Sequence, residues 1–209
     1  MLQTAQKALL PGVYEAATPA ELSVLTRPDC AAVVWPRCPP EAFQSWLDSL
    51  PWQRLPSARV ILRPQEVRRA VMQMCRACGT PECAGRAHLI DDIAALADIF
   101  ARLTRARFLR LRLDVVSTNA CRKFHVDAIS SRLVCTYRGT GTQYGLRQGS
   151  ADPAQIWTLP TGSALLMRGT LWPAQPGAGF VHRSPPIEGT GQRRLVLVLD
   201  PVDDPDQAI

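Results

Sequence analysis

The chain has 209 residues, of which 46% are hydrophobic and 20% charged, a composition that is typical of a globular protein and excludes wholesale disorder. No apolar run reaches the roughly 18 residues that a membrane span requires, so we expect no membrane partner. The 24 Lys and Arg residues exceed the 18 Asp and Glu residues, but they form no basic block, so the formal charge of +6 indicates a basic surface rather than a nucleic-acid partner.

The first 60 residues are rich in proline, which removes a backbone donor and leaves room only for short elements. The apolar run from Ala31 to Trp35 predicts a buried strand. Helices are predicted over 41–50, after a Pro-Pro pair, and over 65–74. The clearest helix is predicted over 89–106, where an apolar stripe recurs at helical spacing.

From Phe108 the apolar period changes to two, which is typical of a strand over 108–115. On that strand Arg110 and Arg112 share one face, which suits either a pocket for an anionic substrate or a solvent-facing sheet surface. Turns rich in Gly and Pro separate four further predicted strands: 132–137, 156–159, 163–167 and 194–199.

Several short strands without intervening helices indicate an antiparallel sandwich or barrel. We therefore predict an α+β fold. A helical, proline-rich region over 1–106 packs on a β-region over 107–209, and the two form one integrated domain. The start of the chain lacks the apolar segment of a signal peptide, and the seven cysteines are an odd number. Both features favour a cytoplasmic protein.

Three residues of the β-region have the chemistry of a metal centre. His125 and Asp127 form an H-x-D motif, and residues i and i+2 of a strand project to the same face. His182 follows 55 residues later and can approach from another strand. Two histidines and one carboxylate form the facial triad of non-heme Fe(II) oxygenases. The alternative is a hydrogen-bonded His–Asp pair together with an unrelated loop histidine.

Two adjacent arginines lie beyond the second histidine, at the start of a predicted strand. Arg193 and Arg194 follow His182 by 11 and 12 residues, which resembles the position of the arginine that binds 2-oxoglutarate in oxygenases that use it. Neighbouring strand residues face opposite sides, so only one of the two can point inward. The alternation does not say which.

The β-region resembles two known groups of proteins. Residues 160–166, PTGSALL, are similar to the turn and strand before the second histidine in the jelly-roll (double-stranded β-helix) folds of cupins and 2-oxoglutarate oxygenases. Most of the chain also resembles the family known as domain of unknown function 1826. That likeness is clearest in five segments: CRKFHVD (121–127), RLVCTYRGTGTQY (132–144), LPTGSALLMRG (159–169), VHRSPP (181–186) and RRLVLVLD (193–200).

The resemblance to the oxygenases implies a jelly roll that binds Fe(II) and 2-oxoglutarate and hydroxylates an unknown substrate, either a small molecule or a protein. It makes His125, Asp127 and His182 the metal ligands. It makes Arg193 or Arg194 the partner of the cosubstrate's remote carboxylate. Tyr137, on the strand after H-x-D, becomes a hydroxyl donor to the same cosubstrate.

A second set of metal-binding residue types lies in the N-terminal region, in the spacing Cys75-x2-Cys78-x4-Cys83-x4-His88. Three thiolates and an imidazole suit a structural zinc ion. The alternatives are unliganded thiols, an iron–sulfur cluster or a redox-active pair. The cluster supports a second functional hypothesis, a non-catalytic, cupin-like metal-binding or metal-homeostasis protein in which this zinc site does the work.

Overall fold

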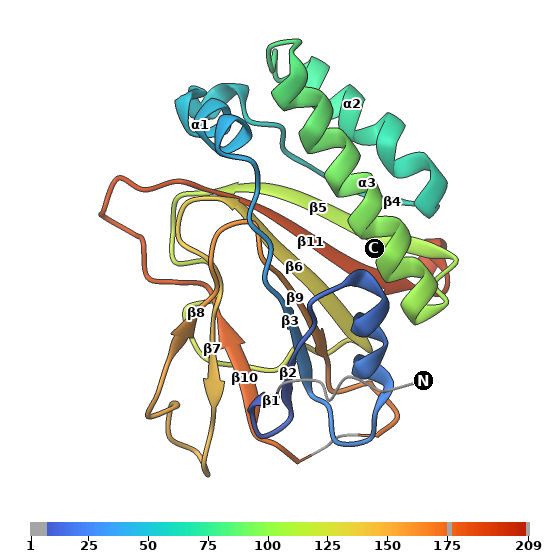
Figure 1. Ribbon diagram of the computed structural model, residues 1–209, viewed down its shortest axis with the longest axis vertical. Coiled ribbons are helices and arrows are strands. Elements are labelled where there is room, and N and C mark those ends of the chain that lie inside the picture. The colour runs from blue at the N-terminus through green and yellow to red at the C-terminus, as the bar shows by residue number, and fades with distance from the viewer. Residues whose placement is uncertain (1–7, 175–176, 208–209) are drawn as a thin grey trace.

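The computed structural model describes residues 8–174 and 177–207, which form a mixed α/β fold around two sheets (Figure 1). The main sheet has eight strands in this spatial order: β1 (Ala8–Leu10), β2 (Val13–Glu15), β3 (Ala32–Trp35), β9 (Ala164–Arg168), β6 (Ser131–Arg138), β11 (Arg194–Val202), β5 (Phe108–Val116) and β4 (Ala58–Leu62). Neighbouring strands are antiparallel except for the parallel pair β2 and β3. The small sheet has the order β10 (Phe180–Arg183), β7 (Gln143–Leu146) and β8 (Trp157–Thr158).

The α-helices belong to the first half of the chain: α1 (Glu41–Ser49), α2 (Val67–Ala77) and α3 (Ala84–Thr104). Short 3-10 helices connect the strands and helices: η1 (Pro19–Thr26), η2 (Trp52–Arg54), η3 (Pro64–Glu66) and η4 (Pro205–Gln207). In the ranges that the structure describes, none of the helices combines the length and apolarity needed to cross a membrane.

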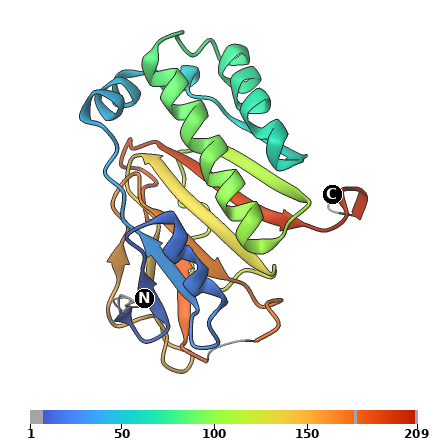
Figure 2. The same cartoon turned by 45° about the vertical axis from the view of Figure 1, so that its right-hand side comes forward.

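The main sheet is covered on both faces, and its strands alternate accordingly. On one face, Leu109, Leu111 and Leu113 of β5 pack with Ile93 and Phe100 of α3 in a fully buried core. Residues of the small sheet pack on the other face, where a second core forms. Figures 1 and 2 show the helices and the small sheet at opposite ends of the molecule. The alternation along β5 is the pattern that predicted this strand.

The N-terminal region is less helical than predicted, because β1 to β4 all join the main sheet. Strand β3 pairs with β9 and β4 pairs with β5, so strands from 1–106 and 107–209 share one continuous sheet. Strands β1 and β2 have three residues each, too few for a period to emerge from the sequence. The helices predicted over 41–50, 65–74 and 89–106 correspond to α1, α2 and α3.

Candidate functional site

Two histidines are held opposite each other by the backbone. The N–H of His125 donates to the carbonyl of His182, and the N–H of His182 donates to the carbonyl of His125, both at 3.0 Å. Residues paired in this way project their side chains to the same side of the ladder. The ring centroids of the two imidazoles lie 4.5 Å apart. The strand expected around H-x-D is wrong in extent, since His125 makes only an isolated bridge to β10.

Asp127 completes a compact cluster with the two imidazoles. Its Oδ1 lies 3.4 Å from Nε2 of His125, and its Oδ2 lies 3.2 Å from Nε2 of His182. One candidate ligand atom from each residue lies within 4.8 Å of the others. The carbonyl of Asp127 accepts from the N–H of Thr170 at 2.8 Å. Gly169 permits this approach, because a Cβ there would lie 2.7 Å from the Asp127 carbonyl oxygen.

The tautomer of the neutral His125 ring follows from its second ring nitrogen. Nδ1 lies 2.9 Å from the carbonyl oxygen of Lys123. A carbonyl can only accept, so Nδ1 carries the proton and donates it. The lone pair of the neutral ring therefore lies on Nε2, the atom that faces Asp127. Metal-binding histidines in proteins have this arrangement, in which the outer nitrogen fixes the tautomer.

A half-buried arginine holds the carboxylate of the cluster. Arg132 donates to Asp200 through Nε at 2.6 Å and through NH2 at 2.9 Å, and its NH1 donates to Oδ1 of Asp127. The second oxygen of Asp127, Oδ2, is buried and has no hydrogen-bond partner. A buried carboxylate oxygen without a donor is costly, and a cation between it and the imidazoles would satisfy it. The cluster therefore fits a bound metal ion.

The pKa values of Asp127 and His182 favour the protonation states that metal ligands need, whereas contact with the Asp127 carboxylate raises the pKa of His125. Burial acts to raise the pKa of Asp127, but the proximity of the His125 and His182 imidazoles and the charge of Arg132 outweigh it and hold the pKa well below its usual range. Burial lowers the pKa of His182, against the pull of Asp127. The carboxyl group is therefore ionised and His182 is neutral, so both can donate lone pairs to a cation.

Arg194 is the inward-facing member of the arginine pair. It is 2% exposed, and its guanidinium donates to the Thr140 carbonyl at 2.6 Å and to the hydroxyls of Thr136 and Thr142 at 3.1 and 3.4 Å. Among the described residues, no carboxylate pairs with it. Burial lowers its pKa to about 10. The guanidinium of Arg193 instead lies 4.3 Å from the ring centroid of Trp52.

The histidines and Arg194 line one cavity of about 120 Å³ between β11, β5 and the segments that carry the cluster. Its apolar wall consists of Val134, Val196 and Val198, on the sheet face opposite the helices. The cavity thus joins two features that lie far apart in the sequence, a candidate metal centre and a buried cation that has no counter-ion among the described residues.

Tyr137 is not part of this cavity, and its predicted role as a hydroxyl donor to a cosubstrate there is wrong. Side chains along β6 alternate, so Tyr137 lies on the helix-covered face while Val134 faces the cavity. The Tyr137 hydroxyl donates to Oδ2 of Asp92 in α3 at 2.6 Å. Arg37 donates to both oxygens of the same carboxylate at 2.7 and 3.1 Å, which completes a partly buried network.

The predicted zinc site is also not supported. Cys75 lies on the buried face of α2, Cys78 is partly exposed at its end, and Cys83 is exposed before α3. The His88 ring packs on Phe43 with 4.4 Å between ring centroids. Within the described part of the chain, the group of His, Cys, Asp or Glu side chains close enough to hold a metal ion is His125, Asp127 and His182. The four zinc candidates do not converge.

The sequence reasoning missed Arg132 and Asp200, which hold Asp127 in place. Asp200 lies in β11 directly after an apolar run and is 1% exposed. A charged residue directly after such a run, and an arginine five residues after H-x-D, were the available signals. Neither signal shows that the two residues meet, because 68 residues separate them.

Comparison with known proteins supports this fold. A family model described as "Protein of unknown function (DUF1826)" matches residues 16–200. Dioxygenase for auxin oxidation 1 from Arabidopsis thaliana, in a 2-oxoglutarate complex, has a TM-score of 0.55 at 8% identity over 96% of this chain and 95% of that one. The dioxygenase for auxin oxidation in rice has a TM-score of 0.50 at 14% identity over 94% and 84%. The fold is thus similar to the jelly roll of 2-oxoglutarate oxygenases. Comparison with curated protein sequences gave no match.

Proposed function

We propose, on the premise that this chain belongs to the DUF1826 family of proteins of unknown function, that it is an Fe(II)- and 2-oxoglutarate-dependent oxygenase. One observation carries the proposal: a His-Asp-His cluster and a buried arginine without a counter-ion border the same cavity. The cluster suits a divalent metal, and the arginine suits a carboxylate. A cosubstrate with an oxo-acid group at one end and a carboxylate at the other matches both.

The metal would be held by Nε2 of His125, Nε2 of His182 and a carboxylate oxygen of Asp127. Three protein ligands leave coordination positions open for other molecules, whereas a closed set of four is structural. When bound, Fe(II) supplies the activation of oxygen, which is coupled to the conversion of 2-oxoglutarate into succinate and carbon dioxide.

The remaining steps depend on side chains of this chain. Arg194 would bind the remote carboxylate of 2-oxoglutarate, and the hydroxyls of Thr136 and Thr142 hold its guanidinium in place. Arg132 keeps the Asp127 carboxylate turned toward the two imidazoles. Val196 and Val198 line the cavity between these groups and limit its hydration. The similar Arabidopsis dioxygenase was solved as a complex with 2-oxoglutarate, which supports this choice of cosubstrate.

The test is conversion of 2-oxoglutarate to succinate after anaerobic loading with Fe(II) and exposure to oxygen. Wild-type protein should form succinate slowly without its substrate. His125→Ala should abolish this conversion because it removes a proposed ligand. The matched control is His88→Ala, which removes the half-buried histidine that packs on Phe43, away from the cluster, and should leave the rate unchanged.

Two results would contradict the proposal. Equal succinate formation by wild type and His125→Ala would place the reaction outside this cluster. Absence of both succinate formation and 2-oxoglutarate binding, with iron still bound through His125, would leave a metal-binding jelly roll without this activity.

A further inference from the structure

The cavity wall continues along the main sheet onto β5 and β4, where it becomes basic. Arg110, Arg112 and Asp114 alternate with leucines that are buried against the helices, so they lie on the cavity side of β5. The second core, beneath the small sheet, includes no residue of β4, and this end of the sheet face stays partly exposed. Charged side chains here can therefore meet both the cavity and solvent.

Two of the arginines oppose each other across the ladder. In the antiparallel register of β4 and β5, Arg59 lies directly opposite Arg112. Like charges at directly opposed positions destabilise a sheet. Burial lowers the pKa of Arg112, and the charges of Arg132 and Arg59 lower it further. An anion bound beside the pair would relieve this repulsion.

The ion pairing of Arg112 within the protein is incomplete. Its closest carboxylate oxygen, Oδ2 of Asp200, lies 3.8 Å from NH2, because Asp200 already accepts two hydrogen bonds from Arg132. Asp114 is the other carboxylate whose charge acts on Arg112. The Nε of Arg112 is buried and has no hydrogen-bond partner. The guanidinium thus keeps donor capacity that the described protein groups do not use.

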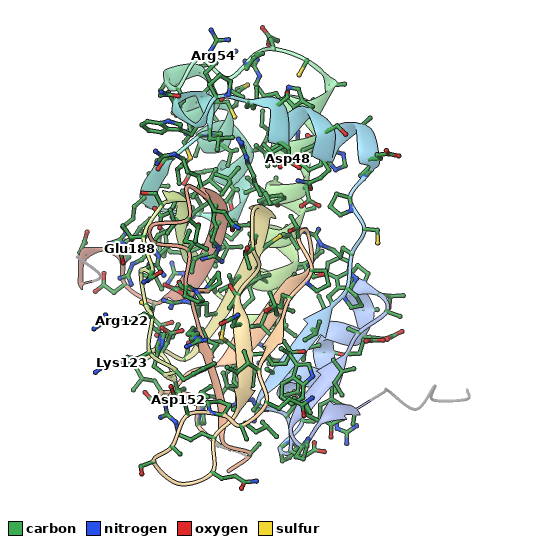
Figure 3. All side chains as sticks on the ribbon, turned by 90° about the vertical axis from the view of Figure 1, so that its left-hand side faces the viewer. Asp48, Arg54, Arg122, Lys123, Asp152 and Glu188 are labelled. Atoms are coloured by element: carbon green, nitrogen blue, oxygen red, sulfur yellow. The ribbon has the colours of Figure 1, made fainter. Side chains whose placement is uncertain are left out.

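Arg112 lines the same cavity as His125, His182 and Arg194. Its side chain is 20% exposed, so it can be reached from solvent. Arg122 and Lys123 lie near the cluster in sequence, yet both project outward at the edge of the molecule (Figure 3). Arg183 of β10 also lines the cavity, but its Nε donates to the Gln143 side chain at 2.8 Å and its guanidinium lies over the Phe124 ring. Arg112 differs from it in keeping a buried donor without a partner among the described residues.

We propose that Arg112, with Arg59 behind it, binds an anionic group of the substrate, and that the substrate is a small organic anion. This inference rests on the proposed function, which assigns Arg194 to 2-oxoglutarate and leaves Arg112 for a second anion. A guanidinium fork binds carboxylate or phosphate oxygens in pairs, so either group suits the position. The small size of the cavity and the recessed position of Arg112 favour a small molecule.

The test is calorimetric titration of the full chain with benzoate, phenyl phosphate and neutral benzamide. The protein is first loaded with Mn(II) and saturated with 2-oxoglutarate under anaerobic conditions. At least one of the two anions should bind, and benzamide should bind at least about tenfold more weakly. Arg112→Gln should weaken binding of that anion by at least about tenfold and leave the affinity for 2-oxoglutarate unchanged. Arg59→Gln should weaken it by about threefold.

Arg110→Gln is the matched control, since Arg110 lies on the same face of β5 but does not line the cavity. The affinity of this variant for the anion should stay within about twofold of wild type. Binding of neither anion by the wild-type protein, or equal binding by wild type and Arg112→Gln, would overturn the inference. If Arg112→Gln fails to fold, an Arg59→Gln variant that binds the anion as tightly as the wild-type protein would overturn the inference.

A parallel titration without 2-oxoglutarate separates the two proposals. If 2-oxoglutarate neither binds nor is consumed, but benzoate binding requires Arg112, the oxygenase fails and the anion site stands. If 2-oxoglutarate is consumed but neither benzoate nor phenyl phosphate binds, only the proposed substrate class is wrong.

Discussion

Arg193 and Arg194 are adjacent in the sequence, but their side chains lie in different surroundings. The Arg193 guanidinium stacks 4.3 Å from the ring centroid of Trp52 beside the helices, whereas Arg194 is buried among threonines at the cavity. Arg194 is the first residue of β11 and Arg193 directly precedes it, and successive side chains of an extended chain project to opposite sides. The pair therefore offers a matched comparison of two arginines that differ in position and share their chemistry.

The first prediction uses this pair. Arg194→Gln should weaken 2-oxoglutarate binding by at least about tenfold, because a neutral amide replaces the charge-assisted pair to a carboxylate. Arg193→Gln should change the affinity by less than about twofold, since it loses only a surface stacking contact. Calorimetric titration of the Mn(II)-loaded protein measures both values. Equal losses in the two variants would show that general positive charge, and not Arg194 itself, attracts the cosubstrate.

The second prediction concerns the buried hydroxyl of Tyr137. Tyr137→Phe removes its hydrogen bond to Asp92 and leaves a half-buried acceptor with one donor fewer. The free energy of unfolding should fall by about 1–2 kcal/mol, measured by urea denaturation. The rate of succinate formation should stay unchanged, because Tyr137 lies on the sheet face away from the cavity. A variant of normal stability that forms succinate more slowly would return Tyr137 to the site.

The third prediction tests the cysteine cluster. In the native protein a thiol reagent such as Ellman's should react rapidly with the exposed thiols of Cys38, Cys83 and Cys121 and slowly or not at all with buried Cys75. Cys83→Ser should remove one equivalent of rapid reaction. A chelator should not change the number of rapidly reacting thiols, because the thiols do not converge on an ion. Reaction of Cys83 only after chelation would reinstate the zinc site.

The fourth prediction concerns stability at alkaline pH. Cys135 is fully buried, and burial raises the pKa of its thiol from an ordinary value near 9 to about 11. The unfolded chain therefore releases this proton at lower pH than the folded chain does. The stabilisation is present in full below pH 9 and is lost as pH rises from 9 to 11, with a total of about 2 kcal/mol.

Cys135→Ala tests that relation, because alanine does not titrate. The difference in free energy of unfolding between wild type and variant should be constant from pH 7 to 9. It should shift by about 2 kcal/mol in favour of the variant by pH 11. Urea denaturation at half-unit steps of pH provides the profile. Parallel profiles up to pH 11 would mean that the thiol ionises as easily in the folded chain as in the unfolded one.

Several features followed from the sequence because they depend on short-range pattern. The alternation of leucines over 108–115 predicted β5, and the apolar stripe over 89–106 predicted most of α3. The H-x-D motif and a later histidine could be grouped as a candidate metal site from residue types alone, because two histidines and one carboxylate are the ligands of a facial triad. The three-residue strands β1 and β2 escaped prediction because so few residues cannot establish a period.

Tertiary packing decided what periodicity leaves open. Alternation divides a strand into two faces but does not say which face meets the helices, so only the packed sheet places Arg194 at the cavity and Tyr137 against α3. Spacing alone suggested that the cysteines surround an ion, yet Cys75 belongs to the buried face of α2 and is directed into the core. The contact between Arg132 and Asp200 joins strands far apart in the sequence, which only the folded sheet brings side by side.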